Sequence, residues 1–162
     1  MAETLSVTDL LPNKFEPKRN YRWVLAIEGI DSFLIADAAR PNITIGEKKI
    51  DFINSYRNVA GKLSFGDLTV KLHDPIAPSG AQQVMEWIRT HYESVSGRAG
   101  YADFYKRDIQ LKMLDPIGTV VELWDIKGAQ LKSADFGSLQ YGSDEIMMIT
   151  LGIKFDNCVL QF

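Results

Sequence analysis

Residues Ala129–Phe155 read AQLKSADFGSLQYGSDEIMMITLGIKF, a polar, turn-rich segment that leads into a run of strand-forming residues. The run Ile146–Phe155 carries Ile, Met, Leu and Phe on both faces, and only Thr150, Gly152 and Lys154 interrupt it. Such a strand is too apolar to have one solvated face, and it carries no catalytic group. The pattern predicts a segment that other structure packs against, and it favours assembly over chemistry.

The composition is that of a globular protein with one main domain, expected over residues 19–162. A chain of 162 residues can bury roughly 68–70% of the surface that its unfolded form exposes. The net charge of -3 argues against a dedicated nucleic-acid clamp, which is normally basic. The single cysteine, Cys158, forms no intrachain disulfide and favours an intracellular origin. The N-terminus lacks the pattern of a secretory signal, and no apolar stretch approaches the ~20 residues that span a bilayer, so we expect no membrane insertion.

Residues 1–18 predict an extended N-terminal arm, because Pro12 and Pro17 interrupt both helical and strand periods. One interpretation is a frayed terminus, and the other is an arm that becomes ordered on a neighbouring subunit. Apolar residues favour the second interpretation, since a disordered tail rarely carries so many of them. These residues are Leu5, Val7, Leu10, Leu11 and Phe15.

Alternating apolar and polar residues predict several strands. We expect a hairpin from Tyr21–Glu28 and Ser32–Ala36, with Tyr21 on the same face as Trp23, Leu25 and Ile27, and a second hairpin from Arg107–Leu114 and Thr119–Ile126. Another strand is expected at Leu68–His73. Strands predominate and no βαβ rhythm appears. The predicted fold class is mainly β, an antiparallel β-sandwich or barrel with one flanking α-helix.

The flanking helix is predicted over residues 79–96. Ser79 and Gln82 form a capping box at its start, and Gly97 supplies the stop. Its apolar stripe repeats at spacings of three and four residues. The stripe consists of Val84, Trp87, Ile88, His91 and Val95.

The segment Ile43–Lys62 (ITIGEKKIDFINSYRNVAGK) combines strand-like pieces with a cationic cluster and two aromatic residues. A connection this long inside a small domain usually has a task of its own. It is either a solvated hairpin or a protruding loop that docks on an acidic partner surface. The residues that could make such contacts are Lys48, Lys49, Phe52, Tyr56, Arg57 and Lys62.

No motif indicates an active site, a cofactor or a metal. His73, Asp74 and Ser79 are the residue types of an acyl-transfer triad, but no G-x-S-x-G elbow is present and the helix cap explains Ser79. His91 is expected to be a packed core histidine, and the loop Gly97–Gly100 lacks the ending of a phosphate-binding loop. The expected catalytic, cofactor-binding and metal-binding residues are therefore none.

Three segments together resemble the tail tube proteins of contractile-tailed bacteriophages. They are Val59–Val70 (VAGKLSFGDLTV), the helix with Trp87-Ile88 that leads to Tyr105-Lys106-Arg107, and the run from Trp124 to Asp156. The resemblance implies a non-enzymatic structural protein of the virion, related to the tubes of contractile injection systems. Six copies would close into a ring, their sheets would join into one β-barrel, and rings would stack into a hollow conduit through which genomic DNA is ejected.

The resemblance also implies partners and surfaces. The partners would be the tail sheath, the baseplate or tube initiator, the tail terminator, and the tape measure protein and DNA that pass through the lumen without specific binding. Assembly would take place in the host cytoplasm. Contacts between rings are expected from residues 43–62, with further contacts from the arm and the tail Cys158–Phe162. The expected wall strand carries Ile146, Met148, Thr150, Gly152 and Lys154.

Charge fits a conduit, because six copies at -3 each carry -18 (6 × -3), and like charge in the lumen would keep DNA from adhering. Other readings remain open. A baseplate tube initiator or a secretion-system tube paralogue would share the fold. A monomeric β-barrel that binds a small apolar ligand would need a closed barrel with an inward pocket, and an enzyme would need a convergent polar cluster.

Overall fold

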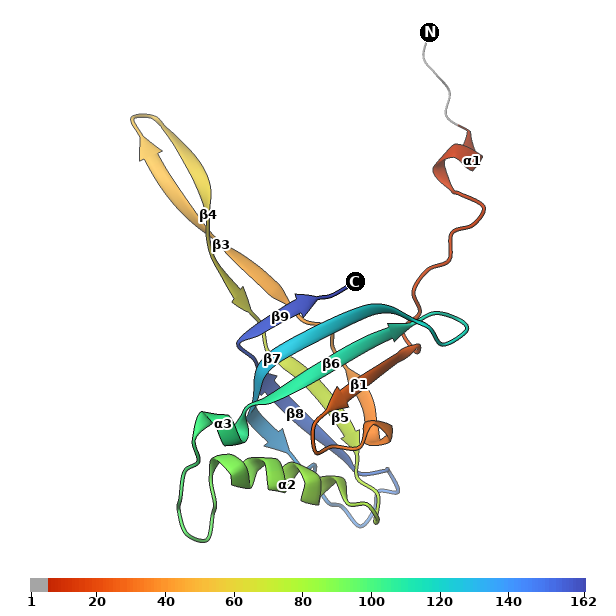
Figure 1. Cartoon of the computed structure of the whole chain (residues 1–162), viewed down its shortest axis with the longest axis vertical. Helices are drawn as coiled ribbons and strands as arrows, with labels where there is room; N and C mark the ends of the chain where they lie inside the picture. The colour runs from red at the N-terminus through yellow and green to blue at the C-terminus, as the bar shows by residue number, and fades with distance from the viewer. Residues whose placement is uncertain (1–5) are drawn as a thin grey trace.

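The computed structural model describes residues 6–162, so Leu5 of the predicted arm lies outside the described residues. Strands dominate the chain, and one long helix packs beside them (Figure 1). The elements are α1 Val7–Leu10, β1 Trp23–Ile27, the 3-10 helix η1 Ser32–Leu34, β2 Ile35–Ala38, β3 Ile43–Phe52, β4 Ser55–Phe65, β5 Leu68–His73, α2 Gly80–His91, α3 Ala102–Tyr105, β6 Arg107–Leu114, β7 Val120–Asp135, β8 Met148–Lys154 and β9 Asn157–Leu160.

The main sheet has the order β1-β6-β7-β8-β5-β2, with β9 paired along β7, and all of its pairings are antiparallel. This confirms the predicted mainly β, antiparallel class with one principal helix. The sheet curls but does not close. Its end strands β1 and β2 flank an open cleft of about 890 Å³, lined by residues that include Trp23, Leu25, Ile35 and Ala38. The closed barrel that a monomeric ligand-binding module would require is therefore not formed.

Strand β7 turns a corner at Gly128. Its first part pairs with β6 and β9, and its last part, from Gln130 onward, pairs with β8. The pairs Lys127↔Asn157 and Gln130↔Lys154 keep one register, so β8 and β9 follow β7 as one bent partner. Gly128 has φ +68, a conformation that favours glycine. The prediction of a polar, turn-rich segment from residue 129 onward was wrong for residues 129–135, which continue β7, and holds for residues 136–147.

The core lies inside the curved sheet, where the inward residues of its strands meet, and α2 packs at one end of it (Figure 1). The alternation predicted for residues 68–73 is confirmed in β5, where buried and exposed residues alternate strictly. Strands β6 and β8 bury every second residue in the same way. The inward residues are Leu68, Val70 and Leu72 in β5, Ile109, Leu111 and Met113 in β6, and Ile149, Leu151 and Ile153 in β8. Helix α2 contributes Val84 and Trp87, both buried.

The first predicted hairpin is wrong. β1 pairs with β6, and β2 pairs with β5 at the other end of the sheet. Only an isolated bridge joins Ile27 to Ile30. The reason is that Gly29 (φ +80) and the 3-10 helix Ser32–Leu34 turn the chain away before a second strand can return beside β1. The strand begins at Trp23 rather than at Tyr21, which precedes β1 and is exposed.

Helix α2 begins where the capping box predicts, and the Ser79 hydroxyl accepts from the Gln82 N–H at 3.5 Å. It ends at His91 rather than at Ser96, because the chain becomes extended at Tyr92, which bridges to Ala99. Val95 is therefore 96% exposed instead of on the apolar stripe. The prediction of a core histidine was wrong, since His91 is exposed, with its ring edge-on to Tyr105 at a centroid distance of 4.5 Å. The short helix α3 was not predicted.

Candidate functional site: the projecting hairpin and its anchor

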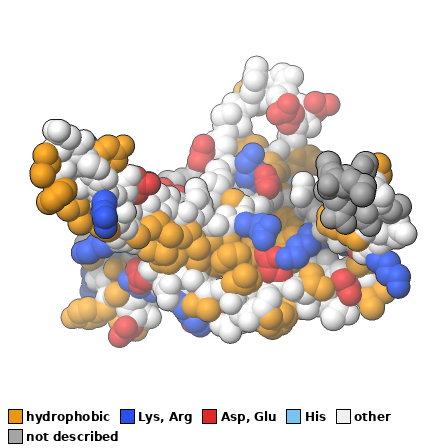
Figure 2. Space-filling view, turned by 90° about the horizontal axis from the view of Figure 1, so that it is seen from above, with side chains coloured by type: hydrophobic (Ala, Val, Ile, Leu, Met, Phe, Trp, Pro, Cys, Tyr) orange, Lys and Arg blue, Asp and Glu red, His pale blue; other side chains and the backbone are white. Residues whose placement is uncertain are grey.

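Strands β3 and β4 form a separate two-stranded sheet that stands away from the body (Figure 1). Every residue of the hairpin except Phe65 is exposed. Seen from above, hydrophobic side chains gather toward its end, with basic ones beside them (Figure 2). A two-stranded hairpin is at best marginally stable in water. Its apolar side chains, which the fold leaves uncovered, make it a candidate contact element.

One face of the hairpin is apolar and basic. Lys48 lies opposite Val59, and Ile50 lies opposite Arg57. Because paired residues share a face and alternate along each strand, these four lie on the same side as Phe52. We call these five residues the basic–apolar face. Neither Lys48 nor Arg57 has a carboxylate partner among the described residues.

On the other face, the cation Lys49 already has partners within the hairpin. Glu47, Lys49, Asp51 and Tyr56 alternate onto this side. The Lys49 ammonium lies 3.5 Å from an Asp51 carboxylate oxygen and 4.3 Å from the centre of the Tyr56 ring. The structure therefore places Lys49 and Tyr56 opposite Lys48, Phe52 and Arg57, so the predicted contact residues divide between two faces.

Lys62 stands apart from the other predicted contact residues. The register shifts between Ile45 and Glu47, which forms a bulge where Gly46 and Gly61 pack closely. A Cβ on Gly61 would lie 3.1 Å from the Gly46 backbone. Lys62 lies in this bulge, between the hairpin's root and its outer part.

The tip of the hairpin holds an apolar residue in an unfavourable conformation. Ile53 has φ +51 and is 87% exposed. A β-branched residue with positive φ is a genuine outlier, at a cost of about 1–2 kcal/mol, and glycine is the usual residue there. Departures from local preference of this kind gather at functional sites.

The predicted wall strand begins later than expected. Ile146 was included in that strand, but β8 begins at Met148, opposite His73, where its partner β5 ends. Ile146 therefore lacks a strand to pair with and is 77% exposed. Within β8, Thr150 and Gly152 are half-buried and Lys154 is exposed, on the face opposite the core residues.

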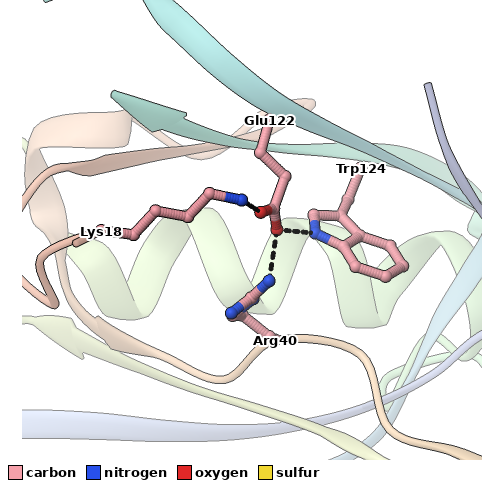
Figure 3. A network of polar contacts seen from close by, with 4 residues as sticks. All are labelled: Lys18, Arg40, Glu122 and Trp124. Atoms are coloured by element: carbon pink, nitrogen blue, oxygen red, sulfur yellow. Dashed lines mark hydrogen bonds and ion pairs between the residues drawn. The ribbon is translucent and has the colours of Figure 1, made fainter. Parts of the chain in front are cut away.

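A buried carboxylate ties both projecting segments to the sheet (Figure 3). Glu122 on β7 is 3% exposed. Lys18, at the end of the arm, and the Trp124 indole N–H both donate to it, and the Arg40 guanidinium donates at 2.6 Å. Arg40 lies between β2 and the hairpin. The roots of the arm and of the hairpin therefore share one anchor.

The environment favours the ionised form of this anchor. Burial alone would raise the pKa of Glu122, but the hydrogen bonds from Lys18 and Trp124 and the charge of Arg40 outweigh it and hold the pKa below its ordinary value. Sequence reasoning missed the site, although a signal existed. Glu122 alternates with Trp124 and Ile126 on the inward face of the predicted strand, where a carboxylate requires partners.

Two further contacts hold the hairpin root. The Gly66 N–H donates to the Asn42 carbonyl at 2.9 Å. Phe65, at the end of β4, packs against Phe155 with ring centroids 5.3 Å apart. The root is thus fixed to the body, while the outer part remains uncovered.

Both ends of the chain differ from simple tails. The arm (residues 6–18) carries exposed apolar residues, including Leu11 and Phe15, around the short helix α1. The predicted tail Cys158–Phe162 belongs to the sheet, because Asn157–Leu160 forms β9 and the Gln161 N–H donates to the Leu123 carbonyl at 2.8 Å.

Of the three residues with the types of a triad, Asp74 and Ser79 cap helix α2, and His73 is the exposed last residue of β5. Asp74 accepts from the Ala81 N–H at 3.2 Å, and Ser79 accepts from Gln82 at the same helix start. Over residues 6–162, no three potential ligands gather as a metal site. In the same part of the chain, no helix is long and apolar enough to cross a bilayer.

Neither protein-family models nor curated proteins match the sequence. Solved structures do match the fold. A chain of the anti-feeding prophage tube-terminating cap is 17% identical, with 97% of this chain and 99% of that chain covered at a TM-score of 0.75. A chain of an extracellular contractile injection system sheath–tube complex in the extended state is 14% identical, and the match covers 98% of this chain and 99% of that chain at a TM-score of 0.71. Hcp1 from Flavobacterium johnsoniae is 11% identical, and the match covers 87% of this chain and 95% of that chain at a TM-score of 0.52. The fold of this chain is therefore that of the tube-type proteins of contractile injection systems.

Proposed function

We propose that the chain is the tube subunit of a contractile machine, the tail tube of a contractile-tailed phage. Copies close into hexameric rings, and the rings stack into a hollow conduit inside a contractile sheath. The observation that carries this proposal is the projecting hairpin, which leaves an apolar and basic face uncovered on a fold of the tube type.

Lateral closure of the ring uses the open sheet. Strands β1 and β2 end the sheet with unpaired backbone edges, and such edges invite pairing with another chain. Joining the sheets of neighbouring subunits into one barrel removes the edges. The outward residues of β8 (Met148, Thr150, Gly152 and Lys154) then belong to the wall of that barrel.

Stacking of the rings uses the hairpin. Lys48, Phe52 and Arg57 contact the next ring through the basic–apolar face, while Lys49 and Tyr56 stiffen the opposite face through their cation–π contact. Lys62 contributes near the bulge. The strained, exposed Ile53 supports this role. A glycine at this position would relieve the backbone strain, but it would have no apolar side chain to bury against the next ring.

The remaining partners are those that a hollow conduit inside a sheath requires. The sheath surrounds the tube, and the baseplate or initiator and the terminator close its ends. The tape measure protein and DNA pass through the lumen without specific binding. The charge of -18 for six copies (6 × -3) opposes adhesion of the phosphate backbone. The protein is structural and not an enzyme.

Negative-stain microscopy of the purified protein tests the proposal. We expect stacked hollow rings, and dispersed single particles would contradict it. Lys48→Glu with Lys49→Glu should block tube growth while the monomer stays folded by circular dichroism. The control is Arg89→Glu with Arg98→Glu, the same change of charge at exposed positions without carboxylate partners among the described residues. Unimpaired tubes from the Lys48/Lys49 variant would overturn the role of the hairpin.

A tube initiator, a terminating cap or a secretion-system tube subunit is the second candidate, because chains of a tube-terminating cap and Hcp1 share the fold. Assembly behaviour separates them. Long open tubes support a main tube subunit, whereas short stacks that stop growing support an initiator or a cap.

A further inference from the structure

We infer that residues 136–147, which we call the acceptor loop, receive the hairpin of a second copy of the chain. This inference rests on the proposed function and names the surface that the hairpin contacts. The acceptor loop connects β7 to β8 and lies toward the α2 end of the molecule, away from the hairpin (Figure 1).

The acceptor loop exposes apolar side chains that the fold does not use. Leu139, Tyr141 and Ile146 are all at least 77% exposed. Three large apolar residues in one connection are more than scattered surface hydrophobes, and such groups mark contact sites. The basic–apolar face of the hairpin supplies matching apolar side chains in Ile50, Phe52 and Val59, with Ile53 at the tip.

The acceptor loop also carries two adjacent carboxylates without partners. Among the described residues, neither Asp144 nor Glu145 has a side-chain hydrogen bond or ion pair. Two other exposed carboxylates, by contrast, are paired within the subunit. Asp108 pairs with Lys127 at 3.0 Å, and Asp67 pairs with Lys132 at 2.6 Å. The free pair is therefore available to cations from outside the subunit.

The charges of the two surfaces are complementary. Residues 136–147 carry two acidic and no basic residues, which gives -2 (0 - 2). Residues 43–62 carry four basic and two acidic residues, which gives +2 (4 - 2). On the basic–apolar face, Lys48 and Arg57 are the unpaired cations. The same combination of charge and apolar surface thus occurs with opposite sign on two parts of one chain.

The placement of the two surfaces sets the kind of assembly. A hairpin that binds a different surface of an identical copy makes a head-to-tail contact. Such contacts do not saturate in a dimer when donor and acceptor lie at opposite ends, and they repeat from one layer to the next. If the acceptor loop bound the sheath or another partner, its charge and apolar side chains would have no reason to match those of this chain's own hairpin.

A charge exchange tests the inference. Asp144→Lys with Glu145→Lys, and separately Lys48→Glu with Arg57→Glu, should each reduce tube formation by at least about tenfold, since like charges then face each other. Combining all four substitutions in one chain should restore tubes, because opposite charges face each other again. The matched control is Glu86→Lys with Asp103→Lys, which applies the same change of charge to α2 and α3.

Crosslinking gives a second measurement that does not depend on charge. In a Cys158→Ser background, Ile53→Cys combined with Tyr141→Cys should give a ladder of disulfide-linked oligomers from assembled tubes. Either cysteine alone should give at most dimers. The absence of a ladder from intact tubes would overturn the assignment, even if a charge variant failed to fold.

Failure of this inference is distinguishable from failure of the proposed function. If wild-type protein forms tubes, Lys48→Glu with Arg57→Glu blocks them, and Asp144→Lys with Glu145→Lys does not, then the acceptor assignment is wrong and the tube function stands. Failure of the four-fold variant to regain tubes would also overturn the assignment. Wild-type protein that forms no rings would overturn the proposed function itself.

Discussion

Arg40 donates a hydrogen bond of 2.6 Å to Glu122 across 82 positions of sequence. Arg40 stands at the root of the hairpin, and Glu122 is buried in the strand that runs through the centre of the sheet. Lys18 binds the same carboxylate from the arm. The two segments that leave the body are thus positioned by one ionised group.

Replacing this group should loosen both segments. We predict that Glu122→Gln lowers the free energy of unfolding by about 1–3 kcal/mol, because charged hydrogen bonds to Lys18 and Arg40 are lost. Urea denaturation measures the loss, and hydrogen exchange should show weaker protection at residues 18–22 and 40–42. The control Asp108→Asn breaks the exposed pair with Lys127 and should cost less than about 1 kcal/mol. Equal losses from the two variants would contradict an anchoring role.

The anchor should also make stability depend on pH. Because the folded pKa of Glu122 is lowered from 4.5, its stabilisation is present above about pH 4.5 and is lost as the pH falls through the folded pKa. The difference in unfolding free energy between wild type and Glu122→Gln should be constant at neutral pH and shrink below pH 4.5. A difference that stays unchanged down to pH 3 would refute the ionised anchor.

The corner of β7 should tolerate no side chain. We predict that Gly128→Ala costs about 2–4 kcal/mol, because φ is +68 and the new Cβ would lie 2.3 Å from the Asp156 carboxylate. Gly118→Ala provides the control. Gly118 has φ +90 with nothing within 4 Å, so only the backbone cost of about 1–2 kcal/mol applies. Thermal denaturation of the pair separates the clash from the backbone cost.

The early end of α2 can be tested with two matched valines. Val84→Ala should destabilise by about 2 kcal/mol, since Val84 is buried against the sheet, whereas Val95→Ala should have almost no effect because Val95 lies beyond the helix. Urea denaturation of both variants is the measurement. A comparable loss at Val95 would mean that the helix continues to the predicted end.

The sequence indicated the contact residues of the hairpin, but it did not indicate how they divide between the two faces of the hairpin. The cations and aromatic residues of 43–62 stand out in composition alone. Which of them share a face depends on the register of β3 against β4, and the shift at Gly46 and Gly61 changes that register within the hairpin. The anchor could not be predicted in full, because the partners of Glu122 are Lys18 and Arg40, which lie far from it in the sequence.

By itself, the sequence determined the local elements. The alternation of β5 and β6, the cap of α2 at Ser79 and the turn that joins β6 to β7 each depend on neighbouring residues only. The tertiary structure alone decided that β1 pairs with β6, that β2 pairs with β5 at the other end of the sheet, and that β7 continues past Gly128 instead of ending in a turn. Side-chain alternation has the same period whichever strand lies alongside, so pairing is settled by long-range packing and by the backbone conformations available at glycines.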